Sequence, residues 1–267
     1  MGNNKIGFIG SGKMAGAIIK GLVKTGFTKS ENITATQVEV SGVEEKSKEL
    51  GVKIILDNKE LVKWADVVFI ATKPNQVLGV LEEIKPFIDS SKLVVSIAAG
   101  VTIKKLEDNL PEKTRVIRVM PNTPALVGEG CTALSPNANV SEEETELALK
   151  IARSFGKASI VPERLMDAVV AASGSSPAFV FMFIEALADS VVEAGMPRSQ
   201  AYMFAAQTVL GSAKLMLETG RHPADLKDMV CSPGGTTIEG VRVLEEKGFR
   251  AAVIDAAKAV AEKSAKL

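Results

Sequence analysis

The chain has 267 residues, 46% of them hydrophobic, enough for one long domain or two shorter ones. Lysine plus arginine and aspartate plus glutamate both number 32, so long-range attraction to nucleic acid or to an anionic membrane is not expected. Two separated cysteines and one histidine are too few for a Cys/His zinc site, so we expect free thiols and no metal.

No secretory signal is predicted, because "MGNNK" leads directly into "IGFIG" without a long apolar core or a cleavage site. The most membrane-like run is residues 178–188, which Glu185 interrupts. It is shorter than the ~20 apolar residues that a spanning helix needs. We therefore expect a buried helix here and a soluble, cytoplasmic protein.

The first half of the chain alternates short apolar runs with helical patterns. Helices are expected at 15–26 and 42–51, and strands at 6–9, 32–36, 52–56, 66–71, 92–99 and 115–120. The strands lack polar alternation, as in a parallel sheet that is covered on both faces. This order indicates an α/β fold with a Rossmann-type doubly wound sheet.

The pattern changes near residue 162. A helix is predicted over 141–156, with Ser141 and Glu144 spaced as a capping box and Gly156 at its end. After a last strand at 158–161, helical spacing dominates to the end of the sequence. We expect a dinucleotide-binding domain over 1–162 and an all-helical domain over 163–267 whose apolar helices pack against a partner chain.

A dinucleotide fingerprint, Gly10-x-Gly12-x-x-Ala15, follows the first strand and opens a helix. Gly10 allows the tight turn, Gly12 the approach of a pyrophosphate and Ala15 close packing, with the helix N-terminus facing the anion. The alternative is a glycine-rich turn without a ligand. Lys13 either adds charge beside the phosphates or points to solvent.

The acid that holds an adenosine ribose is expected at the end of the second strand. Thr36 and Gln37 stand there instead. The missing carboxylate removes a repulsion against a 2′-phosphate and favours NADP(H), but no arginine stands ready to bind that phosphate and Glu39 is close by. NAD(H) therefore stays possible.

Three loops follow later strands, at 71–75, 97–100 and 120–124, and contain small residues or proline. Each could be an ordinary turn. Because ligands of doubly wound sheets bind at the carboxyl ends of the strands, we expect these loops to line one crevice with the fingerprint.

The stretch "CSPGGTTIEG" (231–240) precedes a predicted helix. Thr236 and Glu239 have the spacing of a capping box, so a capped helix start is the simplest interpretation. That interpretation gives Thr237 no role. Gly234 and Gly235 would expose successive N–H groups at the positive end of the helix, which favours a carboxylate site.

Two further features have structural interpretations. "SGSSPAF" (173–179) is expected to begin a helix, with Ser175 or Ser176 as cap and Pro177 at the first helical position, although a ligand-binding role is also open. His222 is expected to be a structural residue before the proline that follows it.

With these residues assembled, the chain resembles the pyrroline-5-carboxylate reductase family along nearly its whole length. The resemblance rests on "GFIGSGKMA", "ATKP", "VVSIAAGVTI", "RVMPNTP", "SGSSPAF", "EALAD", "GMPR", "HPADLKD", "SPGGTT" and "LEEKGFR". It implies hydride transfer from NAD(P)H to the C=N bond of 1-pyrroline-5-carboxylate, giving L-proline in the last step of proline biosynthesis. It also implies a helical C-terminal domain that forms a dimer or an assembly of dimers.

The resemblance also assigns site residues. Those implied to contact the cofactor are Ile9, Gly10, Ser11, Gly12, Lys13, Met14, Gln37, Asn58, Ala71, Thr72, Lys73, Pro74, Ile97, Ala98 and Ala99. Those implied to hold the substrate are Glu163, Ser232, Gly234, Gly235, Thr236 and Thr237. Thr237 is similar to the family threonine that hydrogen-bonds the ring nitrogen, and it is the expected catalytic residue.

The chain departs from the family pattern at four positions: Ser176 stands where glycine is usual, Phe179 where tyrosine is common, Met229 where asparagine is frequent and Lys13 where an amide is usual. None removes a group that the reaction needs. An imine nitrogen is basic and binds already protonated, so positioning and electrostatics suffice without a strong protein acid.

Two alternatives remain at this stage. A β-hydroxyacid dehydrogenase shares the two-domain plan but calls for a lysine on the helix after the Rossmann domain, and residues 165–195 contain none. A noncatalytic nucleotide-sensing dimer would bind NADP(H) without turnover, and the intact "SPGGTT" counts against it.

Overall fold

A computed structural model describes residues 4–266 of the chain. Contacts divide the chain into two compact units, one holding Met1–Ser175 with Val260–Leu267 and the other holding Ser176–Ala259. Each unit is described by itself. Residues 163–175 group with the sheet, and Glu163 and Ser173 both hydrogen-bond to residues of the sheet domain. This grouping starts the second unit later than the domain boundary that the sequence pattern predicts.

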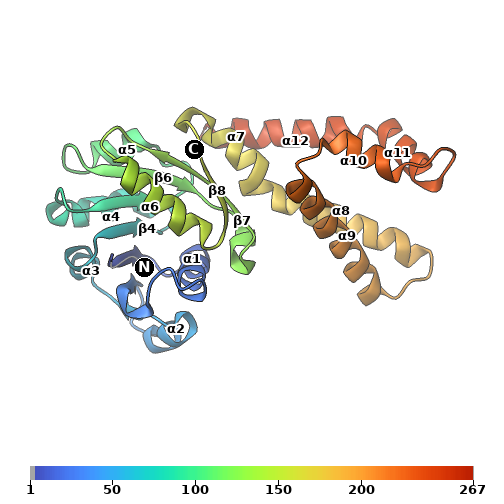
Figure 1. The fold of residues 1–267 in the computed structure, drawn as a ribbon. Coiled ribbons are helices and arrows are strands. Elements are labelled where there is room, and N and C mark those ends of the chain that lie inside the picture. Colours follow the sequence, from blue (N-terminus) through green and yellow to red (C-terminus); the bar gives the residue numbers. More distant parts are fainter. Residues whose placement is uncertain (1–3, 267) are drawn as a thin grey trace. The chain divides into compact units, whose positions relative to one another are not determined.

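The first unit is built on one mixed sheet with the strand order β3-β2-β1-β4-β5-β6-β7-β8 (Figure 1). All neighbouring strands run parallel except β6 and β7, which pair antiparallel. The chain order reverses between β1 and β4, the place where doubly wound sheets bind ligands. The strands are β1 (Ile6–Ile9), β2 (Ile33–Thr36), β3 (Lys53–Ile55), β4 (Val67–Ile70), β5 (Leu93–Ser96), β6 (Arg115–Met120), β7 (Gly130–Pro136) and β8 (Gly156–Ile160).

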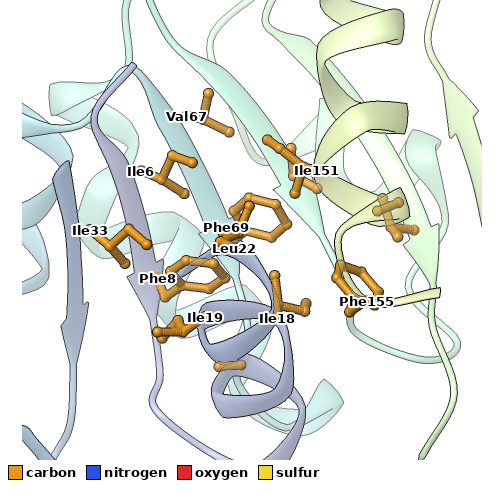
Figure 2. Close-up of a cluster of buried hydrophobic side chains, with 14 of the residues drawn as sticks. Ile6, Phe8, Ile18, Ile19, Leu22, Ile33, Val67, Phe69, Ile151 and Phe155 are labelled. Atoms are coloured by element: carbon orange, nitrogen blue, oxygen red, sulfur yellow. The ribbon is translucent and has the colours of Figure 1, made fainter. Parts of the chain in front are cut away.

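Helices cover both faces of this sheet, so the predicted Rossmann-type architecture is confirmed. One buried cluster joins the strands to α1 and α6, and Figure 2 shows its centre, where the rings of Phe8 and Phe69 stack with centroids 4.6 Å apart. A second cluster packs α3, α4 and α5 against the opposite face. Burying each such large side chain contributes about 1.5–3 kcal/mol. The helices of this unit are α1 (Lys13–Lys24), α2 (Val43–Leu50), α3 (Asn58–Trp64), α4 (Val77–Ile84), α5 (Ile103–Asp108), α6 (Glu142–Arg153) and α7 (Met166–Val169).

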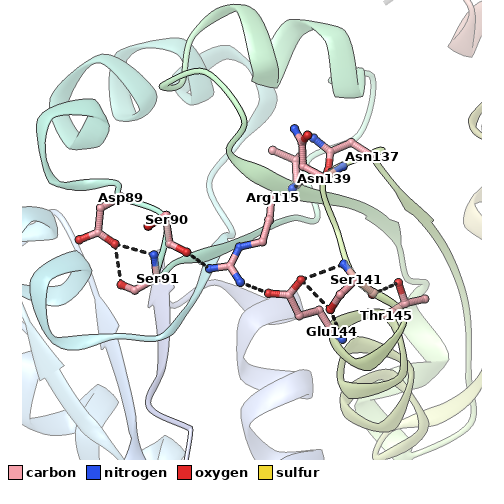
Figure 3. Close-up of polar contacts among 10 residues, drawn as sticks. Asp89, Ser90, Ser91, Arg115, Asn137, Asn139, Ser141, Glu144 and Thr145 are labelled. Atoms are coloured by element: carbon pink, nitrogen blue, oxygen red, sulfur yellow. Dashed lines mark hydrogen bonds and ion pairs between the residues drawn. The ribbon is translucent and has the colours of Figure 1, made fainter.

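The start of α6 confirms the predicted capping box. The Ser141 hydroxyl accepts from the Glu144 N–H at 3.2 Å, and the Glu144 carboxylate accepts from the Ser141 N–H at 2.9 Å. Arg115 at the start of β6 also pairs with Glu144 and donates to the carbonyl of Ser90, which ties this cap to the sheet (Figure 3).

The predicted role of Gly156 as the end of this helix is wrong. The helix ends at Arg153 with Ser154 as its cap, and Gly156 begins β8. Its φ is +153°, and a Cβ there would lie 2.0 Å from the carbonyl oxygen of Gly130 on the neighbouring strand. The glycine is required by close strand approach and not by helix termination.

The segment around Pro177 also differs from the prediction. The α-helix α8 (Ser176–Glu193) has no free, serine-capped start, because the helical path runs into it from α7 through a π-helical turn (Val170–Ser175). Pro177 has no N–H for the carbonyl of Ser173, four residues earlier. That carbonyl instead accepts from the Asn122 side-chain amide at 3.0 Å. Single π-turns inside α-helices are rare, and prolines and π-turns are both places where the regular helix is interrupted.

The second unit is entirely helical. Helices α8 and α9 (Arg198–Thr219) form an antiparallel hairpin whose small core consists of Ala188, Ala201 and Ala205 with five partly buried aliphatic side chains around them. The chain continues through α10 (Pro223–Val230) and α11 (Thr236–Glu246) to α12 (Phe249–Ser264). Small residues at the hairpin contact let the two helices approach closely.

The predicted burial of 178–188 is wrong for the single chain. Phe181 is 66% exposed and Met182 is 68% exposed. By length and composition alone, the helical run Glu163–Glu193 could cross a membrane. Only 6% of its most apolar stretch of 18 residues is buried. The single chain therefore leaves a large apolar helix surface uncovered.

Candidate functional site

The turn between β1 and α1 has the geometry that the fingerprint predicts. Gly10 has φ +104°, and a Cβ there would lie 2.7 Å from the carbonyl oxygen of Ala71 on the neighbouring strand end, so only glycine fits. A Cβ on Gly12 would meet nothing within 4 Å, which leaves room for a ligand.

The start of α1 is open to an anion. Gly12 is its N-cap and supplies no side-chain hydrogen bond, and the first turn holds no acidic residue. The leading N–H groups of a helix have no partner within the helix and carry its positive dipole end. This arrangement fits a pyrophosphate.

A crevice of about 690 Å³ lies at the switch point of the sheet beside this turn. It brings together nine of the predicted cofactor residues: Ile9, Gly10, Ser11, Gly12, Gln37, Asn58, Ala71, Thr72 and Lys73. The remaining six do not line it: Lys13, Met14, Pro74, Ile97, Ala98 and Ala99. The role of every one of these residues in binding stays a prediction.

The crevice has further lining residues that the sequence reasoning missed: Thr36, Val38, Leu56, Gln76, Gly79, Val80 and Glu83. Four of them lie three, four and seven residues apart, counted from the first, and so form one face of α4 with its N-cap: Gln76, Gly79, Val80 and Glu83. That helical period was the available signal, since α4 follows a strand that ends at the switch point.

Polar groups in the crevice form a hydrogen-bond chain. The Gly10 N–H donates to the Thr36 hydroxyl at 3.2 Å, and this hydroxyl donates to the Asn58 side-chain carbonyl at 2.7 Å. The Asn58 amide then donates to the Glu83 carboxylate at 2.9 Å. The end of β2 and the starts of α1 and α3 are thereby fixed relative to one another.

One hydroxyl in the crevice has no partner. The Thr72 Oγ1 atom is buried and makes no hydrogen bond within residues 4–266. A buried hydroxyl left unsatisfied costs free energy, and a ligand in the crevice would remove that cost. Together with the uncapped helix start and the open space at Gly12, this hydroxyl shows that the crevice fits a dinucleotide.

The second candidate site is the loop before α11, in the helical unit. Pro233 and Gly234 form the centre of a turn in which the Gly235 N–H donates to the Ser232 carbonyl at 3.0 Å. Gly234 has φ +66°. Proline at the second position and a glycine with positive φ at the third position are typical of a type II turn. A Cβ on Gly235 would lie 2.3 Å from the Ser232 hydroxyl oxygen, so a larger residue there would force the serine side chain to rotate away.

The helix itself begins without a capping box, so that prediction is wrong. Gly235 is the N-cap, Thr236 is the first helical residue, and Glu239 pairs with Arg242 at 3.0 Å. The N–H of Gly235 already donates to the Ser232 carbonyl in the turn. It is therefore not open to a ligand, contrary to the expectation from the sequence. The N–H groups of Thr236 and Thr237 in the first turn have no side-chain cap, and they form the positive end of α11.

Glu163 lies in the first unit, at the end of the sheet domain. Its Oε1 atom accepts from the buried Arg118 guanidinium at 3.0 Å and from the Ile103 N–H at 2.7 Å. These contacts join β6 and the start of α5 to the segment after β8. They hold Glu163 in place, and its predicted contact with substrate stays a prediction.

The single histidine of the chain has a structural role. His222 is the N-cap of α10, and its Nδ1 atom accepts from the Ala224 N–H at 3.2 Å, which confirms the structural role expected for it. Within residues 4–266, no three histidine, cysteine, aspartate or glutamate residues gather as a metal site. The arrangement offers an anion-binding helix start and hydroxyl groups for positioning a ligand.

A Rossmann-type sheet with a dinucleotide crevice, followed by an all-helical unit, defines a nicotinamide-dependent oxidoreductase of two domains. Residues 5–100 match the family model described as NADP oxidoreductase, coenzyme F420-dependent, and residues 163–267 match the one described as pyrroline-5-carboxylate reductase dimerisation. The chain belongs to the pyrroline-5-carboxylate reductase family. It is 52% identical over 263 residues to the pyrroline-5-carboxylate reductase of Escherichia coli (strain K12), with 98% of each chain covered.

Solved structures agree with this membership. The pyrroline-5-carboxylate reductase of Coxiella burnetii superimposes with a TM-score of 0.93 at 35% identity, covering 99% of this chain and 98% of the other. The Plasmodium falciparum pyrroline carboxylate reductase, solved with NADP bound, gives a TM-score of 0.89 at 34% identity and covers 100% and 98%.

Proposed function

We propose that the protein reduces the C=N bond of 1-pyrroline-5-carboxylate with NAD(P)H to give L-proline, the last step of proline biosynthesis, in the cytoplasm. The observation that carries this proposal is the 52% identity over nearly the full length to an enzyme with that name. The intact "SPGGTT" at an uncapped helix start supports it independently.

NADP(H) is the favoured cofactor and NAD(H) remains possible. The end of β2 carries no acid that would repel a 2′-phosphate, and the related Plasmodium enzyme was solved with NADP bound. When bound, the reduced nicotinamide supplies a hydride. The open N–H groups at the start of α1 would hold the pyrophosphate, and the remaining crevice residues would orient the adenosine end.

The start of α11 would hold the substrate. Its carboxylate would accept from the N–H groups of Thr236 and Thr237 at the positive end of the helix. The Thr237 hydroxyl would bond the ring nitrogen, and Ser232 and Glu163 would complete the contacts. An imine that binds protonated needs no proton from the protein, which is consistent with a single histidine that serves as a helix cap.

Self-association would cover the apolar surface of the helical unit. A groove of about 670 Å³ within this unit is lined mainly by apolar side chains of α8, α11 and α12, among them Met182, Phe183, Phe249 and Val253. Exposed apolar surface on this scale is typical of an interface. A dimer, or an assembly of dimers, would bury it and would account for the apolar run in α8.

The test is to follow oxidation of NADPH and of NADH with and without 1-pyrroline-5-carboxylate. We expect oxidation that depends on this substrate, faster with NADPH, and proline as the product. Cofactor binding without turnover would favour a noncatalytic nucleotide sensor. Oxidation of β-hydroxyacids with NADP⁺, and no imine reduction, would favour the β-hydroxyacid dehydrogenase alternative.

A further inference from the structure

The dinucleotide crevice contains one acidic side chain, and it comes from an unexpected element. In dinucleotide-binding sheets, the aspartate or glutamate that binds the ribose of the cofactor stands at the end of β2, where this chain has Thr36 and Gln37. Glu83, two turns into α4, lines the crevice instead, and Lys73 is the other charged side chain among the lining residues. Glu39, close to β2 in sequence, does not line it.

The contacts of Glu83 give the crevice a fixed hydrogen-bond polarity. An ionised carboxylate only accepts hydrogen bonds, so the Asn58 side chain must present its NH₂ group to Glu83, at 2.9 Å. The Asn58 carbonyl then faces Thr36, whose hydroxyl must donate to it, at 2.7 Å. The same hydroxyl oxygen accepts from the Gly10 N–H. Glu83 therefore orients a chain of groups that reaches the phosphate-binding turn.

In the described part of the chain, the carboxylate of Glu83 forms no ion pair, although Lys73 lines the same crevice. Within residues 4–266, none of the ion pairs involves Glu83, although fourteen lysine and arginine pairs form elsewhere. A phosphate monoester carries a charge of about −1.5 to −2 at neutral pH. A cofactor with a 2′-phosphate would bring that charge into the same crevice, whereas NADH would not.

We propose that Glu83 is a specificity-determining residue for the cofactor. From α4 it supplies the negative charge that the end of β2 lacks, orients Asn58, and lowers the affinity for NADPH relative to NADH. The ratio of the affinity for NADPH to that for NADH is therefore smaller than it would be if the crevice contained no acid at all. This inference rests on the dinucleotide role of the crevice and is independent of the imine substrate.

The decisive variant is Glu83→Gln, which keeps the size of the side chain and an acceptor oxygen for Asn58 but removes the charge. The matched control is Glu82→Gln, the same charge change on the exposed neighbouring residue of α4, which does not line the crevice. Dissociation constants of NADPH and NADH are measured from the fluorescence of the bound reduced nicotinamide, without pyrroline-5-carboxylate. Thermal unfolding of each variant verifies that it folds.

For Glu83→Gln we expect the ratio of the NADH to the NADPH dissociation constant to rise about three- to tenfold at low salt, as one charge is removed across a partly solvated crevice. The rise should shrink towards about 0.3 M salt, because exposed charges are screened there. Glu82→Gln should leave the ratio unchanged. Glu83→Asp, which keeps the charge but shortens the side chain, should weaken the binding of both cofactors without raising the ratio of their dissociation constants.

An equal loss of affinity for both cofactors in Glu83→Gln, insensitive to salt, would make Glu83 a structural residue only and would overturn the proposal. An equal rise of the ratio in Glu82→Gln would overturn it too, since the effect would then be one of net charge. Wild-type protein that binds neither cofactor would contradict the proposed function itself, so the two failures are distinguishable.

Discussion

At the scale of single residues, the catalytic proposal depends on a single hydroxyl group. Thr237 is the second residue of α11, and the loop that leads into it is held by the Ser232–Gly235 hydrogen bond. Valine has nearly the same shape as threonine but lacks the hydroxyl group, so the substitution should leave the helix start intact and remove only the proposed contact with the ring nitrogen.

We predict that Thr237→Val lowers kcat/KM for pyrroline-5-carboxylate about 10- to 100-fold, because a hydrogen bond to a charged group is worth ~1.5–3 kcal/mol. The dissociation constant of NADPH should stay unchanged. The control is Thr145→Val in α6, where the hydroxyl bonds only to the Ser141 carbonyl. Steady-state kinetics measure the effect, and unchanged kinetics in Thr237→Val would remove the nitrogen contact from the mechanism.

The fingerprint glycine gives a prediction about stability. Gly10→Ala places a Cβ 2.7 Å from the Ala71 carbonyl oxygen in a backbone conformation with positive φ. The backbone conformation alone costs about 1–2 kcal/mol and the clash adds to it. We expect a loss of at least 2 kcal/mol in the free energy of unfolding, read from urea titrations.

The comparison for Gly10→Ala is Gly79→Ala, at another glycine that lines the same crevice. A Cβ on Gly79 meets nothing within 4 Å and the residue lies inside α4. Alanine is the better helix former, so the free energy of unfolding should rise by up to about 1 kcal/mol. If both alanines had the same effect, the steric explanation of the Gly10 turn would be wrong.

At the scale of elements, Asn122 links the sheet to the π-turn before α8. Its amide donates to the carbonyl of Ser173, four residues before Pro177, and its carbonyl accepts from the Cys131 N–H at the start of β7 at 2.8 Å. The side chain is itself buried, so these two hydrogen bonds hold it as a link between β7 and the π-turn.

We predict that Asn122→Ala lowers the free energy of unfolding of the first unit by about 1–3 kcal/mol, because two partly buried hydrogen bonds are lost at ~0.5–1.5 kcal/mol each. Asn109→Ala at the exposed end of α5, where the amide bonds only to the Lys105 carbonyl, should cost less than about 1 kcal/mol. Differential scanning calorimetry separates the two outcomes. Equal costs would show that the Asn122 contacts do not stabilise the π-turn.

The elements also show what local sequence can and cannot predict. Apolar runs and the Ser141 capping box specified β1, β2, β4, β5, β6 and α6, since their signals are local. The meaning of Gly156 was missed because it depends on Gly130, which lies on the strand that the sequence reasoning did not predict. The segment at Pro177 has the local pattern of a helix start, and nothing local reveals that the helix already runs from α7 through the π-turn.

The candidate site divides in the same way. The fingerprint turn could be predicted because glycine spacing encodes backbone geometry directly. Glu83 could not, because its position in the crevice depends on how α4 packs beside the start of α3. The same limit explains the capping box wrongly predicted at Thr236. The spacing to Glu239 is correct, but the preceding turn makes Gly235 the cap.

At the scale of the whole molecule, the apolar composition of the helical unit is consistent with self-association. Phe181 and Met182 are more than half exposed on α8, and Phe204 and Leu217 are similarly exposed on α9. A monomer with that surface would be prone to aggregate. The match of residues 163–267 to a dimerisation model supports a second copy of the chain as the cover.

We predict that Phe181→Glu shifts the protein to a lighter species in sedimentation velocity, because placing a carboxylate in an apolar interface costs several kcal/mol. Val127→Glu, at a side chain of the first unit that is also highly exposed, should leave the mass unchanged. Far-ultraviolet circular dichroism should show the helices intact in both variants. Since α8 would then expose its apolar surface, the dissociated variant should also precipitate at lower protein concentration. An unchanged mass for Phe181→Glu would mean that this part of α8 lies outside the interface, and the apolar run at 178–188 would need another explanation.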